Sequence, residues 1–311
     1  MTPAMDRTER FRAAVAGAPV DRPPFTVWYH FGLQHAPAED TARVHLQFLE
    51  AYYLDWLKVM NDYPYPMPEG IETLDDPRQL AAVTPLDPAR TPLAEQLRVL
   101  EILARALRGR AVFVDTLFDA WNTLRRNVVK GAIARFMREA PAELERALAA
   151  VNDTLVRYAR AGLERGASGI FLSATPSEEY VTREQYERFV RPFDLTLLQA
   201  VRERGGIAII HAHGARVYFD RVLDYPVHAI SWADRASGPS LREARALTGK
   251  TLMGGIGHGN FQYTTAAAVR AEVRSALEEA GRERLLLAPG CSLATYTFPD
   301  LIRAARDEAR R

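Results

Sequence analysis

The segment Ile207–Gly214, with the sequence Ile-Ala-Ile-Ile-His-Ala-His-Gly, predicts both the fold class and the position of a functional site. Its four apolar residues without a charge are typical of a strand buried on both faces, as in a parallel sheet. His211 and His213 stand at the end of that strand, where side chains two residues apart point to the same side. The two imidazoles therefore form half of a candidate metal site; the alternative is a hydrogen-bonded histidine pair at a strand end.

Seven other apolar segments extend this pattern, and helical segments separate them. The eight predicted strands are Phe25–His30, Trp56–Met60, Ala111–Val114, Gly169–Leu172, Ile207–Ile210, Val227–Ser231, Thr251–Met253 and Leu285–Leu287. This alternation predicts an α/β protein, and we expect a single (β/α)8 TIM barrel over residues 1–311 with a short N-terminal helical extension at Arg7–Ala16. An open doubly wound sheet is the alternative, but no Gly-x-Gly-x-x-Gly follows the first strand.

Capping residues, glycines and prolines set the bounds of the predicted helices. These helices are Thr41–Tyr53, Leu93–Arg108, two near Leu124–Met137 and Ala142–Gly162, one from Thr182 to about Glu203, Ala215–Leu223, one capped by Ser240 with Glu243, Thr264–Ala280 and Pro299–Arg310. Thr182 with Gln185 forms a second capping box. The aromatic, proline-rich loop Tyr63–Pro68 is a candidate lid.

Composition excludes several classes of partner. With 40 basic and 39 acidic residues the net charge is +1, which predicts neither nucleic acid nor an anionic membrane as a partner. The charged segment Met1–Arg12 is no signal peptide, and no apolar run is long enough to span a bilayer. The single cysteine, Cys291, excludes an internal disulfide. We therefore expect a cytoplasmic enzyme that acts on a small-molecule substrate.

Polar residues gather after the predicted strands, where barrel enzymes carry their chemistry. We predict Asp62 and His258 as catalytic residues. The predicted substrate-binding residues are His30, Tyr63, Asp115, Ser173 and Asp234. Asp115 and Asp234 have a structural alternative, as ion-pair partners or as groups that orient a ligand histidine.

Cys291 follows a Pro-Gly turn after the last predicted strand. A lone cysteine is often a small buried apolar residue, but this one stands in a turn. Together His211, His213 and Cys291 would supply three ligands and leave a fourth position open, as catalytic zinc sites do. Nitrogen and sulfur donors favour zinc over magnesium or calcium.

Seven stretches in order along the chain carry a resemblance to a known family. They are Arg10-Phe-x-x-Ala-x-x-Gly17 with Val20-Asp-Arg-Pro23, Lys58-Val-Met-Asn-Asp62, Gly166-Ala-Ser-Gly-Ile-Phe-Leu-Ser173, Tyr186-x-x-Phe-Val-x-Pro192-Phe, His211-Ala-His-Gly214, Gly254-Gly-Ile and Ala288-Pro-Gly-Cys291. In this order they resemble the uroporphyrinogen decarboxylase superfamily. That superfamily includes zinc-dependent methyltransferases that move methyl groups from corrinoid proteins to thiols.

The resemblance to the methyltransferase branch implies that zinc is held by His211, His213 and Cys291, with His213 standing where the branch has its first cysteine. One thiolate instead of two leaves the metal a stronger Lewis acid. The methyl donor would be a corrinoid protein or a small methylated compound. The first hypothesis is therefore a zinc-dependent, methyltransferase-like enzyme.

The resemblance to the authentic decarboxylases gives the second hypothesis. Asp62 matches the aspartate that holds the pyrrole nitrogens in those cofactor-free enzymes. Their arginine-rich loop after the first strand is replaced here by Trp28–His35, which lacks arginine, whereas an octacarboxylate needs several cations. A cofactor-free decarboxylase of a tetrapyrrole or another polycarboxylate, centred on Asp62, and a non-catalytic corrinoid- or tetrapyrrole-binding barrel stay open as alternatives.

Overall fold

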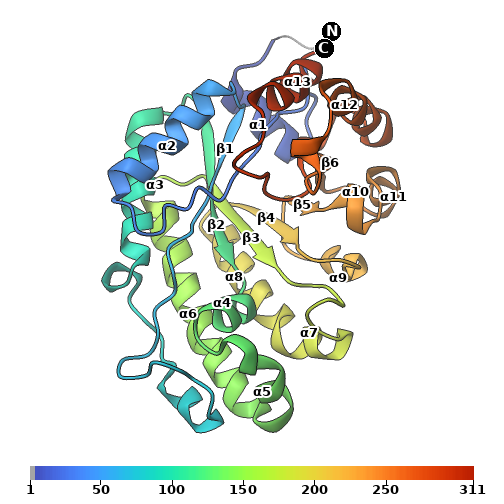
Figure 1. The fold of residues 1–311 in the computed structure, drawn as a ribbon. Coiled ribbons are helices and arrows are strands. Elements are labelled where there is room, and N and C mark those ends of the chain that lie inside the picture. The colour runs from blue at the N-terminus through green and yellow to red at the C-terminus, as the bar shows by residue number, and fades with distance from the viewer. Residues whose placement is uncertain (1–3) are drawn as a thin grey trace.

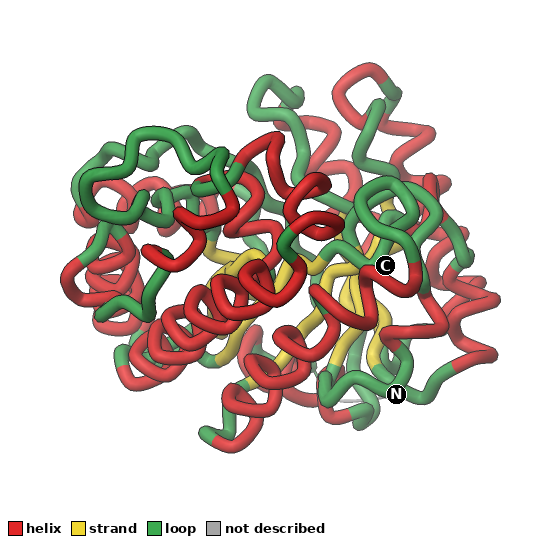
Figure 2. The backbone as a smooth tube through the Cα atoms, turned by 90° about the horizontal axis from the view of Figure 1, so that it is seen from below, coloured by secondary structure: helices red, strands yellow, loops and turns green. Residues whose placement is uncertain are grey.

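The computed structural model describes residues 4–311 as a curled parallel sheet covered by helices (Figure 1). In Figure 2 the strands lie at the centre and the helices lie outside them. The sheet has seven strands in the order of the sequence: β1 Trp56–Val59, β2 Val112–Phe118, β3 Gly169–Ala174, β4 Ile207–Ala212, β5 Ala229–Trp232, β6 Thr251–Ile256 and β7 Leu285–Pro289. Parallel neighbours in sequence order with helices between them are the arrangement of a TIM-barrel-like fold.

The helices follow the apolar patterns of the sequence. They are α1 Arg7–Ala16, α2 Ala38–Ala51, α3 Leu93–Leu107, α4 Ala120–Asn127, α5 Ile133–Glu139, α6 Pro141–Glu164, α7 Arg183–Phe189, α8 Arg191–Glu203, α9 Phe219–Val222, α10 Asp234–Ser237, α11 Leu241–Leu247, α12 Ala266–Ala280 and α13 Pro299–Ala309. Four 3-10 turns complete the set: η1 Pro77–Ala82, η2 Pro88–Arg90, η3 Lys130–Ala132 and η4 Phe261–Tyr263.

Both predicted capping boxes are present, at Thr182 and at Ser240. The helix expected from Thr182 to about Glu203 is divided into α7 and α8 at Val190. Pro192 explains the division, because proline lacks the N–H for an intrahelical bond and its ring crowds the preceding turn. The helix expected over Ala215–Leu223 shrinks to α9, since Gly214 and Arg216 adopt positive φ angles of 116° and 49°.

The prediction of eight strands is wrong at the first of them, Phe25–His30. This segment lies between β7 and β1, where the Thr26 N–H donates to the Leu287 carbonyl and the Asp55 N–H donates to the Phe25 carbonyl. Within the described residues it forms only single bridges, of which Phe25 to Leu287 is one. Pro24 at its start offers no N–H, and the Thr26 hydroxyl instead of a backbone N–H bonds the carbonyl of β1 at Trp56.

Alternate residues of each strand face the barrel interior. Trp56, Phe171 and Ile209 pack there, and Phe11 of α1 closes the amino-terminal end of the barrel with its ring 4.9 Å from that of Trp56. The intervening residues face the surrounding helices. This period of two decides which polar side chains reach the interior.

Buried ion pairs hold α1 in place. Arg10 donates to Asp21 at 2.7 Å and to Asp55 at 2.8 Å, and Arg22 donates to Asp55 at 2.6 Å. The stretch from Arg10 to Pro23 is therefore a structural feature at the closed end of the barrel. None of the helices within residues 4–311 has the length and apolar character needed to cross a membrane.

Candidate metal centre

A cavity of about 270 Å³ opens at the carboxyl ends of β1 to β4. We call it the central cavity. Its lining residues are Trp28, His30, Lys58, Met60, Thr116, Phe118, Asn122, Arg125, Arg126, Phe171, Ser173, Tyr180, His211, His213, Cys291 and Ser292. Each of the strands β1 to β4 contributes a polar side chain to the cavity wall at a position an even number of residues from an interior apolar residue of the same strand. These side chains are Lys58, Thr116, Ser173 and His211.

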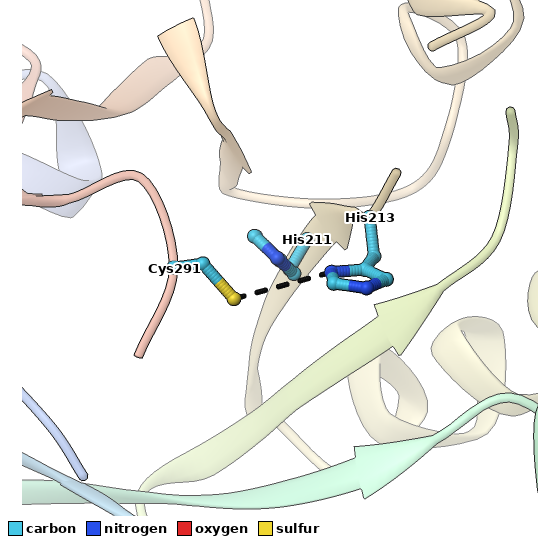
Figure 3. Close-up of side chains that lie close together, drawn as sticks. All are labelled: His211, His213 and Cys291. Atoms are coloured by element: carbon cyan, nitrogen blue, oxygen red, sulfur yellow. Dashed lines mark hydrogen bonds between the residues drawn. The ribbon is translucent and has the colours of Figure 1, made fainter. Parts of the chain in front are cut away.

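Three side chains on one wall of this cavity converge. The donor atoms of His211, His213 and Cys291 all lie within 4.8 Å of one another, and Cys291 Sγ lies 3.9 Å from His213 Nδ1 (Figure 3). Tetrahedral zinc holds such donors roughly 3.3–3.6 Å apart. The donors lie somewhat farther apart than this, and their types, two imidazole nitrogens and one thiol, are those that bind zinc.

His211 has the environment of a metal ligand. Its Nδ1 lies 3.1 Å from Ser231 Oγ, whereas its buried Nε2 has no hydrogen-bond partner among the described residues. A histidine ligand commonly donates one ring N–H to a neighbour and presents the other nitrogen to the metal. Burial lowers the pKa of His211 well below its usual value, which favours the neutral imidazole that binds metals. Its ring also stacks on Phe171 at 5.5 Å.

The backbone around His213 requires the glycine that follows. The His213 N–H donates to the Ala174 carbonyl of β3, and its ring stacks on Tyr180 at 6.0 Å. Gly214 then turns the chain with φ at 116°, and a Cβ atom there would lie 2.6 Å from Ser177 Oγ. Burial lowers the pKa of His213. The His-x-His-Gly pattern thus ends the strand and orients the second imidazole.

A second glycine brings Cys291 to the histidines. Gly290 donates its N–H to the Ile256 carbonyl of β6, and a Cβ atom there would lie 2.7 Å from Ala233 Cα. Only glycine permits this close approach between the turn after β7 and the chain after β5. The half-buried thiol of Cys291 points toward His213 as a result (Figure 3).

Lys58 is a cavity residue that we did not assign to the site from the sequence. Its side chain is buried, its Nζ donates to Thr116 Oγ1 at 2.8 Å, and the ammonium lies 4.4 Å from the centre of the Phe171 ring. Among residues 4–311 it has no carboxylate partner, and burial lowers its pKa to about 7. The sequence feature that could have indicated Lys58 is its charge within the otherwise apolar strand Trp56–Val59.

Helix α4 supplies two further cations that sequence reasoning missed, Arg125 and Arg126. The helix begins at Asp119, whose buried carboxylate accepts from the Asn122 N–H and from both the N–H and hydroxyl of Thr175. Burial raises the pKa of Asp119 to about 6. This cap fixes α4 to the end of β3. Adjacent arginines on a short helix give no sequence signal for a place on a cavity wall, because most such residues face solvent; here Arg125 is half-buried and Arg126 is exposed.

Two predicted substrate-binding residues, His30 and Ser173, line the central cavity. Asp62 does not line it; its carboxylate lies 2.7 Å from His30 Nδ1. Tyr63 is buried elsewhere and donates its hydroxyl to the Ala36 carbonyl at 2.8 Å. His258 lines a separate cavity of about 340 Å³ beside the loop after β6.

Both predicted aspartates of the strands lie outside the central cavity. Asp115 stands inside β2, not after it, and faces the helices, where it accepts from Tyr158 at 2.5 Å and Gln96 at 2.7 Å. Asp234 accepts from the Gly255 N–H at 3.0 Å. Burial raises the pKa of each carboxyl to about 6. Asp234 also lies 3.4 Å from Arg235, which is the ion pair of the structural alternative, whereas the partners of Asp115 are a tyrosine and an amide.

The candidate lid, Tyr63–Pro68, does not cover the central cavity. Tyr65 is buried against α6, where its hydroxyl lies 3.2 Å from Thr154 Oγ1. The Leu86 N–H donates to the Thr154 hydroxyl as well. The chain between β1 and α3 therefore lies along α6. No cavity residue comes from positions 61–92.

Comparisons with known proteins place this site in a family. A family model described as uroporphyrinogen decarboxylase (URO-D) matches residues 61–311. The chain belongs to the URO-D family. No curated protein sequence matches this URO-D protein.

Solved structures share its fold at low sequence identity. A methyltransferase from Methanosarcina mazei is 19% identical and has a TM-score of 0.83, with 98% of each chain covered. A B12-independent methionine synthase from Shewanella sp. W3-18-1 is 14% identical with a TM-score of 0.52, covering 68% of this chain and 65% of that one. A Bacteroidetes-affiliated GH5 cellulase is 8% identical with a TM-score of 0.56, covering 97% and 94%. A barrel shared with a cellulase does not define the reaction, so function must be argued from the site.

Proposed function

We propose that this URO-D family protein is a zinc-dependent methyltransferase whose metal is held by His211, His213 and Cys291. The observation that carries the proposal is the buried Nε2 of His211, which has no hydrogen-bond partner within residues 4–311 and lies beside the His213 imidazole and the Cys291 thiol. Leaving a buried polar atom unpaired is costly unless a ligand occupies it. The fold likeness to the Methanosarcina mazei methyltransferase over 98% of both chains supports this choice within the family.

The chain's own residues prepare the site for methyl transfer. His211 Nδ1 lies 3.1 Å from Ser231 Oγ, and in this proposal Nδ1 is the donor, which leaves Nε2 free for the metal. Phe171 and Tyr180 stack on the two imidazoles and exclude water from one side of each. Zinc bound there would lower the pKa of an acceptor thiol and hold it as a nucleophile.

The methyl donor would be a corrinoid protein or a small methylated compound that reaches the open end of the cavity. The His30–Asp62 pair is suitably placed to contact a substrate there, since His30 lines the cavity and Asp62 holds its Nδ1. In this proposal Asp62 orients His30 and has no direct part in the chemistry.

A cofactor-free decarboxylase is the second candidate, and one observation favours it. Arg125 and Arg126 provide cations that the loop Trp28–His35 lacks. Against it, Asp62 is paired with His30 outside the cavity lining, so the aspartate on which that chemistry would depend does not face the cavity.

Metal content tests the proposal. The full chain is purified without chelator, incubated with zinc, desalted and measured by elemental mass spectrometry. We expect about one zinc per chain in the wild type and a large loss in Cys291→Ala and His213→Ala. His35→Ala, at an exposed histidine in the loop before α2, is the matched control and should retain zinc.

Activity separates the candidates. Zinc-loaded protein is mixed with methylcobalamin and a small thiol, and demethylation of the cobalamin is followed by absorbance. We expect turnover that requires Cys291 and His213. A wild type that takes up no zinc, or a zinc-loaded protein that transfers no methyl group to any thiol while releasing carbon dioxide from a carboxylic acid without metal, would overturn the proposal in favour of decarboxylation.

A further inference from the structure

We propose that the acceptor bound in the central cavity is a small carboxylate, held at its carboxylate end by Arg125 and Arg126 and facing Lys58 at the inner end. This inference rests on the proposed function only in that the methyl group would be transferred to the end of the acceptor opposite its carboxylate. Its evidence is the charge, construction and size of the cavity.

The cavity is strongly cationic in a nearly neutral protein. Lys58, Arg125 and Arg126 line it, and within residues 4–311 no aspartate or glutamate does. The whole chain has 40 basic and 39 acidic residues, so this imbalance is local. A cleft lined by one sign of charge concentrates ligands of the opposite sign.

Arg125 is held ready for an anion. Its guanidinium lies 5.4 Å from the Trp121 ring and 5.3 Å from the Tyr180 ring, and it donates to Asn122 Oδ1 at 2.9 Å. Its buried Nε has no acceptor in the described part of the chain. The Asp119 cap fixes the helix that carries it. A guanidinium oriented in advance loses little conformational freedom when it binds a carboxylate.

Lys58 adds a buried amine that has no carboxylate partner among residues 4–311. Among the described residues its amino group contacts Thr116 Oγ1, Met60 Sδ and aromatic rings. A buried cation without a charged partner is unfavourable, so a negative group in the cavity would be attracted to it. Since carboxylates match the planar fork of arginine, the paired arginines favour a carboxylate at the outer end.

Two aromatic rings place this cationic surface beside the metal ligands. Tyr180 stacks on His213 and also contacts Arg125, and Phe171 stacks on His211 and also contacts Lys58. A ligand that touches the cations thus also reaches the three metal donors. The volume of about 270 Å³ suits a ligand smaller than the molecules that fill drug-sized sites of roughly 300–1,000 Å³.

Calorimetric binding to the full chain tests the inference. The probes are 3-mercaptopropionate, its neutral analogue 3-mercaptopropan-1-ol, and propionate, which has no thiol. We expect 3-mercaptopropionate to bind at least about tenfold more tightly than the alcohol, and propionate binding to weaken about 10- to 100-fold in Arg125→Gln. Arg138→Gln, on the neighbouring helix α5, is the matched control and should bind as the wild type does.

Two results would overturn the inference: equal binding of the acid and the alcohol, or propionate affinity unchanged in the Arg125→Gln, Arg126→Gln double variant. The propionate measurement is repeated in Cys291→Ala, which lacks one metal donor. Propionate binding should persist in this variant, because the arginines do not depend on zinc. If the wild type itself takes up no zinc but binds propionate through its arginines, the proposed function fails and this inference stands. If the wild type binds zinc but binds the acid and the alcohol equally, the proposed function stands and this inference fails. Melting curves of each variant identify loss of folding.

Discussion

Replacing Ser231 with alanine should weaken zinc binding while leaving the three donors in place. Ser231 is fully buried, and its Oγ lies 3.1 Å from His211 Nδ1. Without this acceptor the imidazole loses the contact that selects its tautomer and orientation. Removing such a partner typically costs 10- to 100-fold in metal affinity, or about 1.4–2.8 kcal/mol.

The same substitution predicts a smaller effect on folding. Loss of one buried hydrogen bond should reduce the free energy of unfolding of the metal-free protein by about 1 kcal/mol. Zinc affinity is measured by competition with a chromophoric chelator, and stability by urea denaturation. Ser275→Ala is the matched control: its hydroxyl donates to Glu279 in α12, away from the cavity, so zinc affinity should not change.

The reasoning on Ser231 is refuted if Ser231→Ala binds zinc within about twofold of the wild type while remaining folded. In that case His211 would owe its orientation to the Phe171 ring or would not be a ligand. A loss of zinc affinity in Ser275→Ala of the same size would show that the effect is a general loss of stability.

Three further substitutions test other parts of the structure. Burial lowers the pKa of Lys58 from 10.5 to about 7, so the folded protein binds fewer protons than the unfolded chain between these values and stability rises with pH there. At pH 7 the free energy of unfolding of metal-free Lys58→Met should therefore exceed that of the metal-free wild type by as much as about 4 kcal/mol, and this difference should shrink toward pH 10. A difference that does not change with pH contradicts this reasoning. Gly214→Ala should lose about 1–3 kcal/mol in urea denaturation and also bind zinc more weakly, whereas Gly249→Ala, with open space at its Cβ, should do neither; equal effects would rule out the strain argument. Arg10→Ala leaves the buried Asp55 with one cation fewer and should cost about 3 kcal/mol by the same assay, and a loss below about 1 kcal/mol would mean that α1 is held by apolar packing alone.

The clustering of the three candidate metal ligands was predictable, because the strand periodicity and the order of strands in a barrel both place them at one end of the barrel. The apolar run before His211 indicated a buried strand, and the period of two placed His213 on the same side. Cys291 follows the last strand, and in a barrel the carboxyl ends of all strands meet at one face. The structure brings the donors of these three residues within 4.8 Å of one another.

Asp115 shows how a small error in a strand bound reverses a side chain. The sequence predicted that the strand ends at Val114, so that Asp115 would enter the mouth of the barrel. The strand β2 continues to Phe118, and its interior positions are those of Val112, Val114 and Thr116. Since neighbouring residues in a strand point to opposite faces, Asp115 must face the helices.

Arg125 and Arg126 were not predictable for a different reason. A local pattern tells which face of a helix is apolar, but the end of β3 that receives α4 is set by the contact of Asp119 with Thr175, far along the chain. The first expected strand failed similarly: aromatic and β-branched residues indicated extended structure at Phe25–His30, and the neighbouring prolines limited its pairing.

The candidate metal ligands and the cationic side chains line the same cavity, so their summed charge determines which ligands it attracts. Zinc with the single thiolate of Cys291 would carry a net charge of +1, to which Arg125 and Arg126 each add a positive charge and Lys58, whose pKa burial lowers to about 7, adds a partial one. Asp62, the nearby carboxylate at the rim, is already engaged with His30. A neutral acceptor would leave this charge uncompensated, whereas an acceptor with a carboxylate at one end and a thiolate at the other supplies two negative charges at the two places where cations stand. If zinc is bound as proposed, the single thiolate of its donor set and the arginines of α4 favour the same kind of substrate, although they come from elements that no local sequence pattern connects.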